Sequence, residues 1–520
     1  MSTKTALLLL TSALGLLCAQ APLPDPTKLG RITIAVLDSV TSQPIPNAEV
    51  MLQAHFGPPL SGTTSTDGRI EFTRIQPGDY QVASVKAAHY FFDPVVRTSI
   101  PLTGQQLANT ATIRLAPQGR IRGTVLNDRG EPVASAAVSA LRAMGSPTGT
   151  QWLAAMSVMA DAQGNYELPD LTPDRYIVRA MSLANAKEQL ERTFYPSSEA
   201  TETALRLDVA AGAILERVDF RLLPATLFHI RGTIAGDQLP PKSTVLAQDC
   251  SASRTRAEGL WFTQLDADGR FDVGGVPHGT VCVSYGATKD FKPFGTTTVS
   301  VVDRDIDGVA LTVTPPRDIE GQFRIPSDAP PAVPQVMLVP SGPFPAPPVE
   351  ARVDTVEGTF HLAGVLPMEY HIVISPPGGT YVKSITQAGQ DHSNGTLIPA
   401  DGALVIELGT ATSRLTGRIN WSGAPARELT VTASPQGDLR TRSDLRKIGA
   451  STIAGDYFVF GLAPGTYKVI AWDTASAFSA GPDLVDQLPG AIVTIGEGEQ
   501  RALELRPLTA RELELAKQKF

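Results

Sequence analysis

The histidines are the first residues of this chain to consider for catalysis or metal binding. A zinc peptidase needs histidine and glutamate at fixed spacing, because three protein ligands with one open position activate a water molecule. None of the seven histidines has a glutamate three residues later, and neither H-E-x-x-H nor G-x-S-x-G occurs in the 520 residues. We therefore predict no catalytic residue, no metal site and no cofactor.

Two aspartate-rich runs have a partial likeness to calcium loops. They read DADG at 266–269 and DRDIDG at 303–308. A calcium loop needs a fuller set of oxygen ligands, with a later glutamate. Aspartate before glycine is also a common turn, because the carboxylate bonds to nearby backbone and glycine accepts a positive φ. We prefer the turn interpretation to a calcium site.

Two cysteines are candidates for a disulfide. Cys250 and Cys282 lie in the same repeat unit, whereas the third cysteine, Cys18, lies near the N-terminus. In an oxidising compartment, two thiols in one small domain favour a disulfide. The alternative is a pair of unbonded thiols that pack as small apolar side chains.

Aromatic side chains are the candidates for carbohydrate binding, since a flat apolar ring can stack on a sugar. Trp152 lies in an insertion of the second unit, and Trp261 precedes a predicted turn in the third. We name these two as a possible glycan platform. Burial in a core is the competing interpretation for each.

Composition limits the class of partner. The formal net charge is −8, charged residues are 18%, and the basic residues do not form clusters. Binding to a phosphate backbone needs clustered positive charge, so we predict no nucleic-acid partner. The 45 glycines and 42 prolines indicate a turn-rich globular chain.

One sequence pattern, which we call the template, occurs five times along the chain. It begins at a glycine, has apolar residues at plus two and plus four, and reaches tyrosine at plus twelve in four copies and Val281 in one. Proline lies at plus nine in four copies. The period of two predicts a strand, a tight turn and a second strand, which we interpret as a hairpin. The template glycines are Gly68, Gly164, Gly269, Gly358 and Gly455.

Further alternating runs flank each template, so each unit has six or seven short strands and roughly ninety to a hundred residues. The pattern predicts a small antiparallel sandwich per unit. Thr509 with Glu512 forms a capping-box pattern and predicts a short terminal helix. The expected domains are a signal at 1–21, sandwiches at 29–116, 117–224, 225–315, 316–412 and 413–508, and a helical tail at 509–520.

Four motifs together resemble the carboxypeptidase regulatory-like domain. They are G-x-V, P-V-x-x-A-x-V, D-x-x-G-x-Y and L-x-P-x-x-Y-x-V, all present between Gly123 and Val178. The resemblance covers nearly the whole mature chain and implies an all-β protein of five tandem prealbumin-like (transthyretin-like) sandwiches, of a secreted bacterial type. In carboxypeptidases this domain is an accessory, so the resemblance implies no peptidase activity.

The N-terminus has the pattern of an export signal. Lys4 precedes an apolar run from Ala6 to Leu17, and Ala19-Gln20-Ala21 fits a cleavage site. Cys18 follows Leu17 rather than the small residue that precedes a lipidated cysteine. Cleavage, an uncleaved anchor and lipidation remain the alternatives. We expect a secreted or extracytoplasmic protein, at the periplasm or cell surface, with membrane contact only through this segment.

We therefore expect a non-catalytic structural, adhesive or interaction module, whose partner is a surface glycan or protein. A carbohydrate-binding protein is the alternative, and it predicts two or more exposed aromatic side chains on one face of one unit. An accessory of a peptidase system is a third hypothesis, which predicts histidines and carboxylates that converge between units.

Overall fold

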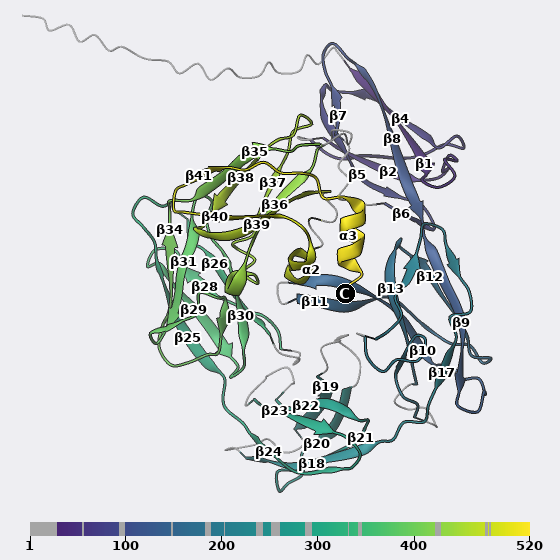
Figure 1. The fold of residues 1–520 in the computed structure, drawn as a ribbon, viewed down its shortest axis with the longest axis vertical. Helices are drawn as coiled ribbons and strands as arrows, with labels where there is room; N and C mark the ends of the chain where they lie inside the picture. Colours follow the sequence, from purple (N-terminus) through teal and green to yellow (C-terminus); the bar gives the residue numbers. More distant parts are fainter. Residues whose placement is uncertain are drawn as a thin grey trace, which may run out of the picture. The chain divides into compact units, whose positions relative to one another are not determined.

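The computed structural model describes residues 29–519 apart from short segments. Those segments are 55–56, 93–98, 147–148, 183–188, 202, 236–242, 251–259, 287–293, 331, 342–345, 422–427, 474–476 and 478–479. The expected export signal at 1–21, with Cys18, lies outside the described residues. The described part of the chain forms two compact units, which divide between Pro117 and Gln118, and nearly all described elements are strands (Figure 1). The prediction of an all-β chain of tandem sandwiches is confirmed.

Sandwich one is the first compact unit. Its two sheets have the strand orders β4-β1-β8-β6 and β3-β2-β5-β7. Neighbouring strands are antiparallel except for the first and last, β1 and β8, which run parallel. The strands are β1 (Gly30–Asp38), β2 (Glu49–Ala54), β3 (Leu60–Thr63), β4 (Arg69–Ile75), β5 (Gly78–Lys86), β6 (Tyr90–Phe91), β7 (Ser99–Leu102) and β8 (Ala108–Pro117).

Sandwiches two and three repeat this plan in the second unit. The expected insertion in sandwich two belongs to the long antiparallel pair β10–β11. Sandwich two has β9 (Gly119–Asn127), β10 (Ala137–Ser146), β11 (Gly149–Met159), β12 (Asn165–Leu171), β13 (Asp174–Met181), β14 (Thr193–Phe194), β15 (Leu207–Val209), β16 (Ile214–Leu215) and β17 (Phe220–Leu222). Sandwich three has β18 (Phe228–Ala235), β19 (Thr244–Asp249), β20 (Leu260–Gln264), β21 (Arg270–Val276), β22 (Gly279–Tyr285), β23 (Gly295–Val301) and β24 (Ile306–Thr312).

Sandwiches four and five complete the second unit. Sandwich four has β25 (Arg317–Arg324), β26 (Gln335–Pro340), β27 (Val349–Glu350), β28 (Arg352–Asp354), β29 (Thr359–Val365), β30 (Tyr370–Ser375), β31 (Tyr381–Gln387), β32 (Gln390–Asp391), β33 (Thr396–Leu397) and β34 (Leu404–Gly409). Sandwich five has β35 (Ser413–Arg418), β36 (Thr430–Pro435), a 3-10 turn η1 (Gly437–Leu439), β37 (Lys447–Ala450), β38 (Asp456–Leu462), β39 (Gly465–Trp472), α2 (Pro482–Gln487), β40 (Ala491–Ile495), β41 (Gln500–Ala502) and α3 (Ala510–Lys517).

The two strands of the template do not pair with each other, so the hairpin interpretation is wrong. In sandwich one, β4 pairs with β1 while β5 pairs with β2 and β7 in the opposite sheet. The same holds for β12 and β13, β21 and β22, β29 and β30, and β38 and β39. Period two shows that each strand buries one face, but it does not show which sheet each strand joins. The turn therefore crosses from one sheet to the other in every sandwich.

The template tyrosine stabilises this crossing turn. The hydroxyls of Tyr80, Tyr176 and Tyr467 donate to backbone carbonyls four residues earlier, at 2.8, 2.8 and 2.9 Å. Burial raises the pKa of each of these phenols. A buried hydroxyl that is bonded to its own turn serves the fold rather than a ligand.

The register of the first sheet explains the glycine that precedes four of the templates. In sandwich four, Gly321 of β25 is opposite Phe360 of β29, and a Cβ at Gly321 would lie 2.0 Å from the ring. Sandwich one has a smaller residue at plus two, Ile70, and Ile34 in place of the glycine. The equivalent glycine–aromatic pairs are Gly123–Tyr166, Gly232–Phe271 and Gly417–Tyr457. A large aromatic residue on the template strand is thus opposite a glycine on the first strand, and a smaller residue is opposite a residue with a side chain.

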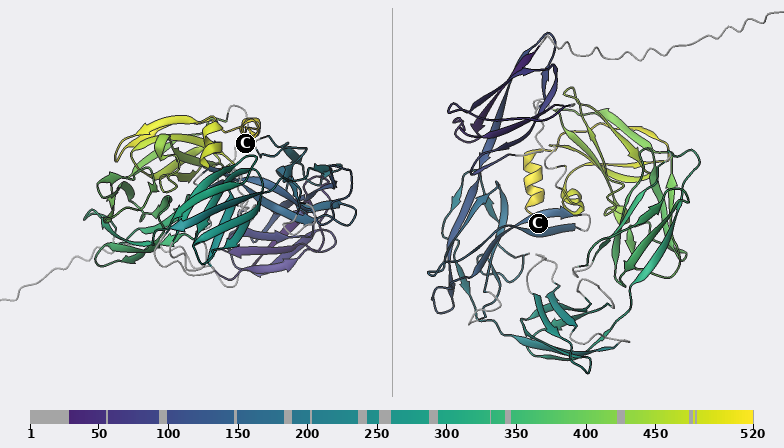
Figure 2. Two further views of the ribbon diagram at one scale, coloured as in Figure 1. Left: turned by 90° about the horizontal axis from the view of Figure 1, so that it is seen from below. Right: turned by 180° about the vertical axis from the view of Figure 1, so that it is seen from behind.

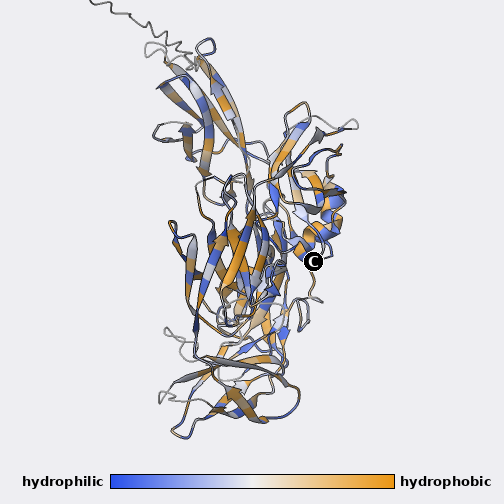
Figure 3. Cartoon of the chain, turned by 90° about the vertical axis from the view of Figure 1, so that its left-hand side faces the viewer, coloured by the Kyte–Doolittle hydropathy of each residue, from blue (hydrophilic) through white to orange (hydrophobic). Residues whose placement is uncertain are grey.

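Each sandwich has a hydrophobic core cluster of its own between its two sheets. The apolar residue at plus four is opposite an apolar residue of the first strand in all five, as in Ile32 with Phe72 and Leu415 with Val459. Figure 3 shows the resulting alternation of hydrophobic and hydrophilic residues along the strands. Phe294 of sandwich three joins the core of sandwich four and so connects two neighbours.

Sandwich five has a second apolar cluster on the outer face of its second sheet. Ile470 and Trp472 of β39 are covered there by α2 and α3, through residues such as Val485 and Leu513. The predicted terminal helix is confirmed as α3, with Thr509 and Glu512 in a reciprocal capping box. The helix α2 was not predicted, because six residues that begin with proline carry little periodicity. Figure 2 shows both helices from two further directions.

Candidate binding surface

The outer face of the first sheet distinguishes sandwich five from the others. The residue three positions after the template glycine lies on this face. In four sandwiches this residue is ionisable and lies beside a charged residue of the first strand. The pairs are Arg31–Glu71 at 3.4 Å, Arg122–Glu167 at 2.7 Å, Arg231–Asp272 at 3.1 Å and His361–Asp318 at 3.5 Å.

Sandwich three has the most extensive of these charged faces. Arg231 contacts Asp305 at 3.0 Å and Asp307 at 3.2 Å in addition to Asp272. Its hydrogen bonds to Asp272 and Asp307 raise its pKa. Burial acts to raise the pKa of Asp272, but hydrogen bonds from His229 and Arg231 outweigh burial and hold it below its usual range. Two aspartates of the calcium-like run at 303–308 therefore pair with an arginine.

In sandwich five the equivalent residue is Phe458, and Phe460 follows on the same face. Their side chains are 49% and 55% exposed. The ring centroids are 4.9 Å apart and the planes are inclined by 40°. We call these two residues the aromatic pair. An exposed aromatic pair, with one ring at the position where the other sandwiches have an ionisable residue, is a candidate contact surface.

The aromatic pair lies on a sheet face whose adjoining strand, β35, carries an arginine two residues from Thr416. Thr416 of β35 is opposite Phe458 in the register. Arg414, two residues earlier on β35, bonds to Gln500 of β41. The edge of β38 is covered by β37, because Gly449 approaches so closely that a Cβ there would lie 2.1 Å from the Phe458 carbonyl oxygen. Contacts to this surface would therefore be made by side chains rather than by an open strand edge.

The two tryptophans named from the sequence do not form such a surface. Trp152 is only 9% exposed and packs with Leu141, Ile177 and Phe194. The guanidinium of Arg206 lies over its ring, 5.8 Å from the centroid. Trp152 also lines a cavity of about 200 Å³. Core residues and Arg206 cover most of the ring, so it does not offer an exposed platform on which a sugar could stack.

Trp261 is half-buried. It packs against the core of sandwich three. The residues of β20 alternate, so that Trp261 faces inward while its neighbours Leu260 and Phe262 are exposed. The sequence pattern around Trp261 is compatible with either direction, because β20 has only five residues and apolar side chains flank Trp261 on both sides.

The structure joins Cys250 and Cys282 in a disulfide, with Cα atoms 5.5 Å apart. This separation is typical of disulfides. Cys282 is buried in β22. The bond in the purified protein remains a prediction, and its test is given below.

One histidine lies between two carboxylates at the boundary of sandwiches two and three. His278 Nδ1 is 3.7 Å from Glu191, and Nε2 is 3.3 Å from Glu199. His278 thus connects the two sandwiches through carboxylates on both sides of its ring. Over the part of the chain that the structure describes, no group of three histidine, cysteine, aspartate or glutamate residues is arranged to hold a metal ion.

Comparison with known proteins identifies one segment directly. The family model of the carboxypeptidase regulatory-like domain matches residues 120–220, from the second residue of β9 to the first residue of β17 in sandwich two. Together with the repeated sheets, this match supports a tandem-repeat β-sandwich protein. Among curated proteins, none matches this chain.

Several solved structures are similar at low scores. A streptococcal ancillary pilin has 9% identity, covering 55% of this chain and 99% of that chain, with a TM-score of 0.21. BcpA, the major pilin subunit of Bacillus cereus, has 10% identity, the same coverages and a TM-score of 0.17. The Bacillus anthracis TIE protein has 14% identity and a TM-score of 0.18; the match covers 55% of this chain and about half, 51%, of that protein.

Within the described ranges, no helix is both long and apolar enough to cross a membrane.

Proposed function

We propose that this protein is a non-catalytic structural and interaction module that acts outside the cytoplasm. Each of the five sandwiches has its own core cluster, so every repeat adds an outer surface that a partner can contact. The expected domain limits, 29–116, 117–224, 225–315, 316–412 and 413–508, are part of this proposal. The export signal read from residues 1–21 supports the location.

The aromatic pair is the observation that carries the interaction role. Phe458 and Phe460 are each about half exposed, and Phe458 lies at the position where the other four sandwiches have an ionisable residue. Covering roughly 100 Å² of apolar surface per ring favours association by about 2.5 kcal/mol. Two adjacent rings therefore suffice as the centre of a contact, because interface energy concentrates in a few such residues.

Cell fractionation and protease treatment of intact cells test the location. Full-length protein in the extracytoplasmic fraction, degraded by added protease while a cytoplasmic marker stays intact, is the expected result. Recovery of the uncut chain with the cytoplasmic marker would contradict the proposal.

Carbohydrate binding is the second candidate, and the aromatic pair is the specific observation that favours it. That hypothesis requires at least two exposed aromatic side chains on one face of one sandwich, and Phe458 with Phe460 meets this requirement. Arg414 lies on the adjoining strand, where a guanidinium can bond to sugar hydroxyls or carboxylates.

Affinity electrophoresis in gels that contain polysaccharide separates the two candidates. The variant Phe458→Ser/Phe460→Ser should lose retardation that the wild type shows. Phe262→Ser is the matched control, since Phe262 is 72% exposed on a different sandwich. Equal retardation of all three proteins would remove the aromatic pair as the carbohydrate surface. No retardation in any polysaccharide would remove the carbohydrate candidate and leave a protein partner.

The peptidase-accessory hypothesis has one supporting arrangement, His278 between Glu191 and Glu199. Both nitrogens of this imidazole face carboxylates, so the arrangement fits a bridge between sandwiches better than a reactive site.

A further inference from the structure

A cavity of about 220 Å³ lies beside α2 in sandwich five. This volume is several times that of one water molecule. Most of its lining comes from the end of β36, the loop that leads to β37, and α2. The lining includes Ser434, Gln436, Arg440, Arg442, Arg446 and Asp486. Three guanidinium groups and one carboxylate thus give the lining a net positive charge.

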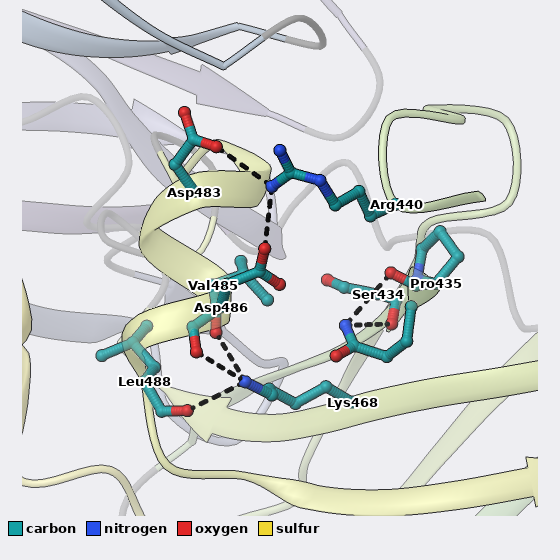
Figure 4. Close-up of polar contacts among 9 residues, drawn as sticks. Ser434, Pro435, Arg440, Lys468, Asp483, Val485, Asp486 and Leu488 are labelled. Carbon is teal, nitrogen blue, oxygen red and sulfur yellow. Dashed lines mark hydrogen bonds and ion pairs between the residues drawn. The ribbon is translucent and has the colours of Figure 1, made fainter. Parts of the chain in front are cut away.

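Two of the three arginines are already neutralised. Arg440 contacts Asp483 at 3.0 Å and Asp486 at 2.8 Å, as Figure 4 shows. Arg442 makes two bonds of 2.6 Å to Asp444. These arginines hold the loop against α2 and leave little capacity for another anion.

Arg446 differs, because its guanidinium bonds to backbone carbonyls. Nη1 donates to the carbonyl of Ala480 at 2.7 Å and Nη2 to the carbonyl of Ala477 at 2.5 Å. Its Nε–H is buried and has no hydrogen-bond partner among the described residues. Burial lowers the pKa of this guanidinium. A buried cation without a carboxylate partner is costly, and an anion beside it would offset that cost.

Ser434 provides a second unsatisfied donor on the same cavity. The residue is 6% exposed, and its Oγ is buried with no partner among the described residues. Its backbone carbonyl accepts a bond from Gln436 at 3.5 Å, so only the hydroxyl remains open (Figure 4). Lys468 does not supply the missing partner, because its Nζ donates to carbonyls at the end of α2, including Val485 at 3.1 Å.

We propose that this cavity binds a small carboxylate. The Nε–H of Arg446 and the Oγ–H of Ser434 are the two donors, and the carboxylate supplies the negative charge that Arg446 lacks. Charge-assisted hydrogen bonds of this kind are the stronger class, and guanidinium geometry suits planar carboxylates. The carboxylate could belong to a free organic acid, a uronic acid or a peptide C-terminus. This site is separate from the aromatic pair and does not depend on it.

Calorimetric titration of the full chain tests the proposal with four probes. Acetate, galacturonate and N-acetylglycine represent the three sources, and inorganic phosphate tests for a general anion site. Choline chloride at equal ionic strength controls for screening. Saturable binding of at least one carboxylate, tighter than phosphate, is the expected result, and the tightest probe identifies the source.

Variants assign the binding to this cavity. Ser434→Ala should weaken the carboxylate about tenfold, since a hydrogen bond to a charged group contributes on this scale. Ser284→Ala is the matched control: Ser284 is also buried with an unsatisfied hydroxyl, but it lies in β22 of sandwich three. Arg446→Met should abolish binding, and if that variant does not fold, the two serine variants still decide.

Three outcomes would overturn the proposal. They are no saturable binding of any carboxylate, phosphate binding as tight as the best carboxylate, and equal affinity of the wild type and Ser434→Ala.

Discussion

Arg442 and Asp444 form a bidentate ion pair with two bonds of 2.6 Å, and each side chain is only 2% exposed. Arg442 also donates to the carbonyl of Ser393 in sandwich four, at 2.6 Å. The pair therefore fixes the loop before β37 and connects sandwich five to sandwich four. The two charges lose their hydration on burial, and the bidentate hydrogen bonds compensate for much of that loss.

Removal of one partner should destabilise the protein strongly. Asp444→Asn leaves the Arg442 charge buried without its counterion, and we expect a loss of about 3–5 kcal/mol in the free energy of unfolding. Asp456→Asn in the same sandwich is the control, because the Arg418–Asp456 pair is 67% and 63% exposed and should contribute less than about 1 kcal/mol. Urea unfolding measures both. Similar losses in the two variants would contradict the assignment.

The disulfide between Cys250 and Cys282 should be present in protein purified without reductant. Peptide mapping under non-reducing conditions should recover the two cysteines in one linked peptide. Cys250→Ser/Cys282→Ser should unfold about 2–4 kcal/mol more easily, because the loop that the bond closes gains entropy in the unfolded chain. Addition of reductant should lower the stability of the wild type but not of the double variant. Free thiols in the untreated wild type would refute the bond.

The residue at plus six of every template has a left-handed backbone. Three of these residues are glycines, including Gly461 with a φ of 74°, but sandwich one has Arg74 with a φ of 57°. A residue with a side chain is strained by about 1–2 kcal/mol in this backbone conformation. Glycine avoids that strain, but it loses more conformational entropy on folding, which offsets part of the gain. Arg74→Gly should therefore stabilise the protein by about 0.5–1 kcal/mol.

Gly461→Ala is the reverse experiment. A Cβ at this position would meet no atom closer than 3.8 Å, so any loss of stability would come from backbone strain rather than from a clash. We expect a loss of about 1 kcal/mol or more. Thermal unfolding of both variants checks the pair, and a stabilised Gly461→Ala would exclude the explanation.

The cap of α3 should make the terminal helix sensitive to acid. Hydrogen bonds from Arg506 lower the pKa of Glu512 to about 2, with burial opposing and Thr509 assisting. The pKa of Glu512 is lower in the folded state than in the unfolded state, so the ionised carboxylate stabilises the fold. This contribution is fully present above the unfolded pKa of about 4.5 and is lost as the pH falls through about 2.

Glu512→Gln isolates this effect. The wild type should lose more stability than the variant between pH 4.5 and 2, and the two curves should run parallel at higher pH. Thr509→Ala should cost about 1 kcal/mol at neutral pH, because it removes the cap. Identical acid responses of wild type and Glu512→Gln would show that the cap carboxylate is not involved.

The candidate sites could be predicted only in part. The alternation around Trp261 did not show which way its ring faces, and Trp152 lies in an insertion whose partner residues come from distant strands. In the fifth copy of the template, Phe458 lies at plus three and Phe460 at plus five. Comparison of Phe458 with the plus-three residues of the other copies, Glu71, Glu167, Asp272 and His361, would have identified the difference. The cavity beside α2 had no sequence signal, because its lining combines a loop, a strand end and a six-residue helix.

Local chemistry determined what the sequence could predict by itself. Period-two alternation predicted the strands, and glycine and proline predicted the turns. Five equal spacings predicted the repeats, and Thr509 with Glu512 predicted the terminal helix. Tertiary structure alone decided that the two template strands belong to opposite sheets. It also decided that Arg442 is buried against Asp444 and that Phe458 remains exposed. The physical reason is that alternation records which face a strand buries, whereas strand partners and solvent exposure depend on residues far away in the chain.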